Sequence, residues 1–167
     1  YAQPLSGWLG HRAPFEFDPD YAPAPSIDRF AVGTPSILAL AALDSGVDTV
    51  LAAGIEALRA KSVALTDAFI ACIESQCGGA VALVSPRAAE ARGSQVCFSH
   101  PQAYAVMQAL IGRGVIGDFR APNVLRFGFA PLYVRHVDAV DAAAALADVL
   151  HRGAWREPRF QRGGPVT

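Results

Sequence analysis

The sequence lacks the features that would indicate a membrane or a nucleic acid as its partner. It contains no run of eighteen or more uncharged apolar residues, so no membrane span is predicted. Lysine and arginine number 14 against 15 acidic residues and form no basic stripe, which argues against nucleic-acid binding. The three cysteines are an odd number without metal-ligand spacing, so we expect reduced thiols in a cytoplasmic protein and no metal site.

Lysine itself is scarce, because Lys61 is the only one among 167 residues. The composition is instead 52% hydrophobic, which is enough for a domain with a substantial core. The chain begins without methionine, and residues 1–33 are rich in proline and aromatic residues with little periodicity. A self-contained domain seldom begins with so long an irregular stretch, so we expect a piece of a longer polypeptide.

Periodic apolar residues begin after residue 33. Residues 34–77 have the spacing of connecting helices, with a pause near Gly46 and a long helix over 54–76. Thr34 can be the N-cap of the first helix, with Pro35 at its first position. A helix start of this kind suits a phosphate, although ordinary capping is the alternative.

The C-terminal part alternates between strand and helix patterns. Residues 78–155 have the order β-β-α-β-β-α, and the last element is an amphipathic helix over 136–152. Its residues expected to point inward are Val137, Val140, Ala144, Leu146, Val149 and Leu150. The order predicts an α/β protein that ends in a small α+β domain, with a mostly antiparallel sheet covered on one face by helices. The segment after Gly153 is rich in Arg, Pro and Gly; we expect it to be frayed, with residues 156–167 as a tail.

One arginine interrupts the most apolar predicted strand, which lies within residues 123–133. Arg126 stands between Leu125 and Phe127, where a charge is costly unless an anion meets it. A guanidinium binds a carboxylate through a two-point fork. The pattern leaves two interpretations open: an internal pair with Asp or Glu, or binding of the carboxylate of a small substrate.

The N-terminal segment contains two more candidate residues in the motif SGWLGH at residues 6–11. Trp8 lies between glycines and is either a packing residue or the lining of a ligand pocket. His11 fits a hydrogen-bonding strut as well as a catalytic base. The sequence pattern does not decide between these roles.

Three separated motifs together resemble kynureninase: SGWLGH at 6–11, GTPSILAL at 33–40 and GVIGDFR…VLRFGFAPLY at 114–133. The segments 56–70 and 85–98 are also similar to that family. Kynureninases are pyridoxal-phosphate hydrolases of the type I aminotransferase fold. The resemblance therefore implies pyridoxal 5'-phosphate as cofactor, L-kynurenine or 3-hydroxykynurenine as substrate, and a homodimer that shares its sites across the interface.

The resemblance also implies roles for individual residues. Trp8 and Thr34 would contact the cofactor phosphate, Arg126 would bind the substrate α-carboxylate, and His11 would be a substrate-binding neighbour. Lys61 has no matching context, so the cofactor lysine is expected before residue 1 and the piece alone is expected to be inactive. Two alternatives stay open: another type I pyridoxal enzyme, such as a cysteine desulfurase or an aminotransferase relative, or a non-catalytic α+β binding module.

Overall fold

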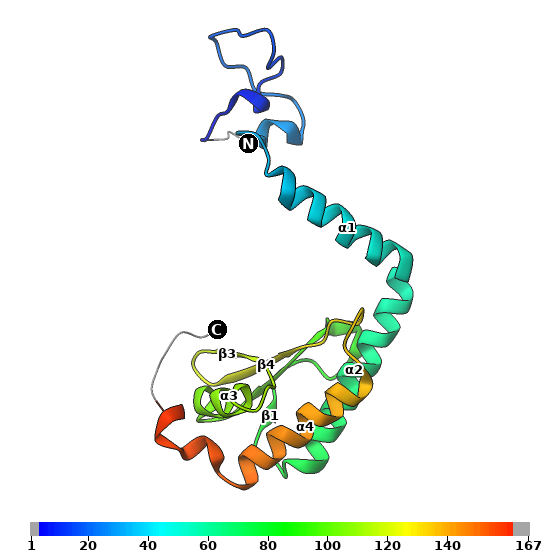
Figure 1. The fold of residues 1–167 in the computed structure, drawn as a ribbon, viewed down its shortest axis with the longest axis vertical. Coiled ribbons are helices and arrows are strands. Elements are labelled where there is room, and N and C mark those ends of the chain that lie inside the picture. The colour runs from blue at the N-terminus through cyan, green and yellow to red at the C-terminus, as the bar shows by residue number, and fades with distance from the viewer. Residues whose placement is uncertain (1–3, 162–167) are drawn as a thin grey trace. The chain divides into compact units, whose positions relative to one another are not determined.

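The computed structural model describes residues 4–161 and divides the chain into two compact units, Tyr1–Ala52 and Ala53–Thr167 (Figure 1). The division falls within the range 34–77 that the sequence predicts as connecting helices. Of the predicted tail, residues 162–167 lie outside the described residues.

The first unit combines an irregular segment with one long helix. Short 3-10 helices cover Trp8–Gly10 and Ile27–Phe30, and α1 covers Ile37–Ala53. The predicted pause is wrong, because α1 passes through Gly46 without interruption. The predicted N-cap is also misplaced: α1 begins at Ile37, and the Ser36 carbonyl accepts the first helical N–H, from Leu40, at 3.0 Å.

The second unit has the predicted α+β architecture. After α2 (Ile55–Gln76), the order β-β-α-β-β-α is confirmed by the elements β1 (Ala82–Leu83), β2 (Gln95–Ser99), α3 (Ala103–Ile111), β3 (Asp118–Arg120), β4 (Val124–Gly128) and α4 (His136–His151). The strands form one sheet in the order β1-β2-β4-β3, and every neighbouring pair is antiparallel. The small antiparallel sheet predicted from the sequence is therefore confirmed.

The core lies between α2, α3, α4 and one face of the sheet. Alternate strand residues point to opposite faces, and Val96, Phe98, Leu125 and Phe127 are buried on the helical side. Phe69 of α2 is at the centre of this core: its ring centroid lies 6.1 Å from Phe98 and 4.9 Å from Phe127. The other face, which we call the open face, carries the intervening residues Cys97, Asp118, Arg120, Val124 and Arg126.

The segment that follows α4 is ordered as far as residue 161, so the expectation of fraying from Gly153 is wrong there. Two 3-10 helices cover Ala154–Arg156 and Pro158–Phe160. Trp155 and Phe160 are half-buried against the core, and the Trp155 ring meets His100 edge to face at 5.6 Å. These two aromatic residues hold a segment whose Arg, Pro and Gly content predicted disorder.

The helices and cysteines of the second unit and of α1 bear on two further expectations from the sequence. Within residues 4–161, no single helix is both long and apolar enough to cross a bilayer; α1 and α2 reach such values only when taken together across their break at Gly54. Cys72, Cys77 and Cys97 are free thiols, and Cys77 is buried. Burial raises the pKa of Cys77, as expected for a thiol that fills a core position.

Candidate functional site

Arg126 lies on β4, at the middle of the open face. β4 pairs with β2 on one side and β3 on the other, which places Arg126 directly opposite both Cys97 and Asp118. Residues directly opposite one another in antiparallel strands project from the same face of the sheet. The sheet therefore places a thiol, a guanidinium and a carboxylate in one row across the open face.

The Asp118 carboxylate binds two arginines through one of its oxygens. Arg126 Nη2 donates to Asp118 Oδ2, and Arg120 Nη2 lies 2.8 Å from the same oxygen. An internal carboxylate therefore meets Arg126, as one of the two interpretations of the sequence requires. Two cations share this single anion, which leaves one positive charge in excess on the open face.

The guanidinium of Arg126 keeps donors that no described residue uses. Its Nε and Nη1 atoms have no hydrogen-bond partner within residues 4–161, and the side chain is 30% exposed. The remaining N–H groups can still form the two parallel bonds by which arginine binds a carboxylate. The internal pair and an external ligand are therefore compatible with one another.

In the first unit, one close backbone approach brings two of the sequence motifs together. Gly7 packs directly on the main chain of Val32, because a Cβ atom added to Gly7 would lie 1.7 Å from the Val32 carbonyl oxygen. No side chain fits in that space. The contact places the motif of Trp8 beside the segment that leads to Thr34.

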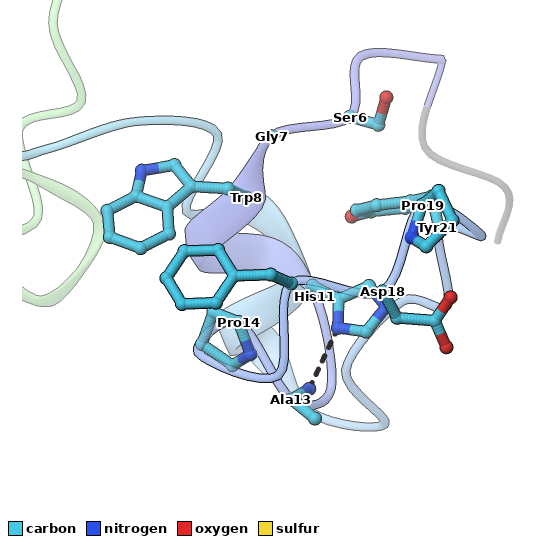
Figure 2. A pocket seen from close by; sticks show the side chains of 10 residues that line it. Ser6, Gly7, Trp8, His11, Ala13, Pro14, Asp18, Pro19 and Tyr21 are labelled. Carbon is cyan, nitrogen blue, oxygen red and sulfur yellow. Dashed lines mark hydrogen bonds between the residues drawn. The ribbon is translucent and has the colours of Figure 1, made fainter.

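Trp8 lines a pocket of roughly 360 Å³, together with Ser6, His11, Asp18 and Tyr21 (Figure 2). The indole is 48% exposed and meets Phe15 edge to face at 5.4 Å. Neither its N–H nor the hydroxyl of the exposed Thr34 has a hydrogen-bond partner among the described residues. An indole N–H and a hydroxyl shortly before a helix start are donors that fit a phosphate.

His11 is buried and uses both ring nitrogens within its own loop (Figure 2). Nδ1 accepts a hydrogen bond from the Ala13 N–H at 2.9 Å, so Nε2 carries the proton and donates to the Asp20 carbonyl at 3.2 Å. The Tyr21 ring packs against the imidazole at 5.6 Å. This geometry is that of the hydrogen-bonding strut, and a substrate-binding role for His11 stays a prediction.

Sequence reasoning missed two residues with a clear structural role. Asp118 lies within the motif GVIGDFR, but its contact with Arg126 follows only from the β3–β4 register. Arg92 lies in the connection between β1 and β2, where a charged residue is usually exposed, yet its side chain is only 2% exposed. Arg92 ties that connection to α2, since it donates to Thr66, to Asp67 and to the carbonyls of Pro86 and Arg87.

The fold and the site define a small α+β domain that carries an arginine–aspartate pair on the uncovered face of its sheet. The family model "Kynureninase C-terminal domain" matches residues 58–146, which include most of α2, the whole sheet, α3 and most of α4. The chain belongs to the kynureninase family.

The chain is similar to curated kynureninases along its whole length. It is 52% identical to the kynureninases of Burkholderia mallei (strain SAVP1) and Burkholderia pseudomallei (strain K96243), over 168 aligned residues that cover 100% of this chain. It is 46% identical to the kynureninase of Pseudomonas fluorescens over 166 residues, or 99% of this chain. In each case the chain spans about 40% of the relative's length.

Proposed function

We propose that this chain forms the C-terminal part of a pyridoxal-phosphate-dependent hydrolase that cleaves L-kynurenine, or its 3-hydroxy form, to anthranilate or 3-hydroxyanthranilate and L-alanine. The observation that carries the proposal is the 52% identity to curated kynureninases across the entire chain. The aligned region includes both the segment with Trp8 and Thr34 and the strand with Arg126.

Arg126 would bind the α-carboxylate of the substrate. The excess positive charge on the open face and the donors that Asp118 leaves unused support this role. A hydrogen bond to a charged group contributes about 1.5–3 kcal/mol, and a fork of two such bonds also fixes the orientation of the amino-acid head. Orientation is what brings the side-chain ketone to the place where water attacks it.

Trp8 and Thr34 would hold the phosphate of pyridoxal 5'-phosphate, through the indole N–H and the hydroxyl. Their unused donors support this assignment, as does the Gly7–Val32 contact that brings their segments together. When bound, the cofactor supplies an electron sink for the bond-breaking steps at the substrate. By the family resemblance, we propose that these residues serve the site of a second subunit in a homodimer.

The lysine that binds the cofactor is proposed to lie in the part of the polypeptide before residue 1. Lys61 is half-buried on α2. The hydrogen bonds from Arg135 are the main cause that lowers the pKa of Asp138, and the nearby charge of Lys61 lowers it further. That position supports a structural role for the only lysine of the chain. Residues 1–167 alone are therefore expected to show neither cofactor colour nor hydrolysis.

The experiment is a kynurenine cleavage assay on the full reading frame that contains this chain, with pyridoxal phosphate added and anthranilate followed by fluorescence. We expect turnover from the complete polypeptide and none from residues 1–167. A non-catalytic α+β binding module is the second candidate, which the internal Arg126–Asp118 pair favours. Absence of turnover from a folded, cofactor-loaded full-length protein would support that module and refute the hydrolase.

A further inference from the structure

Asp118 is an unusual carboxylate for a residue whose only role is structural. Its Oδ2 atom accepts a hydrogen bond from Arg126 and forms an ion pair with Arg120, whereas Oδ1 is buried and has no hydrogen-bond partner within the described part of the chain. A buried acceptor without a partner is destabilising, and such atoms in native proteins often mark a functional constraint. The side chain as a whole is 19% exposed, so the carboxylate is largely enclosed.

The sheet fixes where the carboxylate lies relative to Arg126. Asp118 is opposite Arg126 in the β3–β4 pairing, and Arg120 is opposite Val124, two residues along the same face. Gly117 limits the movement of β3 further, because a Cβ there would come within 3.0 Å of the Arg126 carbonyl oxygen. The carboxylate is therefore held at a defined position beside the guanidinium by main-chain hydrogen bonds.

We propose that Asp118 is a positioning residue that holds the Arg126 guanidinium by Nη2 and leaves its other N–H groups for the α-carboxylate of the substrate. This inference rests on the proposed function. A long arginine side chain loses rotamer freedom when it binds a ligand, and one that is already held loses less. Arg120 neutralises Asp118 from the other side, so that the pair does not cancel the charge that attracts the substrate.

The test is a double-mutant cycle in the full-length protein, with steady-state kinetics on L-kynurenine. We expect Asp118→Asn to raise KM about five- to thirtyfold with kcat within about twofold, the pattern of lost substrate binding. Asp118→Asn should add nothing in the Arg126→Gln background, because it acts through that guanidinium. An unchanged KM in Asp118→Asn, or an equal rise in both backgrounds, would overturn the positioning role.

Arg113→Gln is the matched control, since it removes an arginine from an ion pair with Asp148, away from the open face, and leaves the Arg126 contact in place. We expect its KM to stay within about twofold of the wild-type value. The outcomes separate the two proposals. An Arg126→Gln variant with unchanged KM refutes the substrate contact itself, whereas a raised KM in Arg126→Gln with a normal one in Asp118→Asn refutes only the role of Asp118.

A second measurement needs neither activity nor cofactor. In the 167-residue chain, NMR of the arginine side chains should show separate, slowly exchanging Nη hydrogens for Arg126, because a held guanidinium rotates slowly. In Asp118→Asn the guanidinium should rotate faster, so that these signals merge into an average. Asp118→Glu, which keeps the carboxylate, should show partly separate signals again. Averaged Arg126 signals in the wild-type chain would refute the proposal even if the Asn variant fails to fold.

Discussion

Helix α1 is more apolar than α2, yet only α2 is packed into a core. α2 buries Leu65, Phe69, Ile70 and Ile73 in the core of the second unit. In α1 no residue is buried, and Leu38 is 84% exposed. A helix of this length is marginal in water without tertiary packing, so α1 needs a covering surface that the first unit does not provide.

The largest expected effect is a loss of stability on removing a buried side chain of α2, compared with an exposed one of α1. Phe69→Ala should lower the free energy of unfolding of the second unit by about 3–5 kcal/mol, because it removes the ring at the centre of the core. Leu40→Ala in α1 should change it by less than about 0.5 kcal/mol. Urea unfolding followed by tryptophan fluorescence measures both, and equal losses would show that α1 is packed after all.

The next effect concerns the substrate side of the proposed site. In the full-length protein, Arg126→Ala should weaken kynurenine binding by about tenfold to a thousandfold, because a charged fork is lost. Cofactor retention should be nearly unchanged. Equilibrium binding measures the affinity for kynurenine, and the absorbance of the cofactor measures its retention. Loss of cofactor in Arg126→Ala would contradict the role assigned to Arg126.

Trp8→Ala should show the reverse order of effects. We expect the affinity for pyridoxal phosphate to fall by about tenfold, since one phosphate donor is removed, before substrate binding is affected. Cofactor titration of the apo full-length protein measures this change. A Trp8→Phe variant, which keeps the ring contact with Phe15 but lacks the N–H, separates the hydrogen bond from packing.

The smallest effect is a pH dependence in the second unit. Burial lowers the pKa of His100 below its ordinary value of 6.5, and Nδ1 accepts a hydrogen bond from the Gln102 N–H at 3.0 Å. The neutral ring is therefore favoured in the fold, so its stabilisation is present above pH 6.5 and is lost as the pH falls toward the lower folded value. As the pH falls through this range, the urea concentration at the midpoint of unfolding should decrease in the wild type, and it should decrease less in His100→Gln.

The sequence of strands and helices along the second unit could be predicted because its apolar residues recur with a clear period. The buried face of α4 could be predicted only in part, because Leu146 and Val149 are buried as expected and other residues are not. Val137 and Val140 were expected inward but are exposed, whereas Ala139 and Ala143 are buried. An Ala- and Val-rich helix is apolar on several sides, so only its packing against α2 and α3 decides which side is covered.

The candidate site was predictable in its residue types and not in its contacts. A lone arginine in an apolar strand indicates that an anion is near, but the sequence does not say that Asp118 is that anion. That contact depends on the antiparallel register of β3 and β4. The N-cap at Thr34 was misplaced because Ser36 has the same capping chemistry two residues later, and sequence alone gives no preference between them.

The contact between Gly7 and Val32 also determines which changes of chain length this region can accept. It closes the loop between residues 8 and 32, and doubling the length of such a loop adds only about 0.6 kcal/mol of closure entropy. Extra residues at Glu16, which is exposed and does not line the pocket of Trp8, would therefore be accommodated, and a reporter peptide could be inserted there. A residue added in place of Gly7 would instead bring a Cβ atom against the main chain of Val32, where there is no room for one.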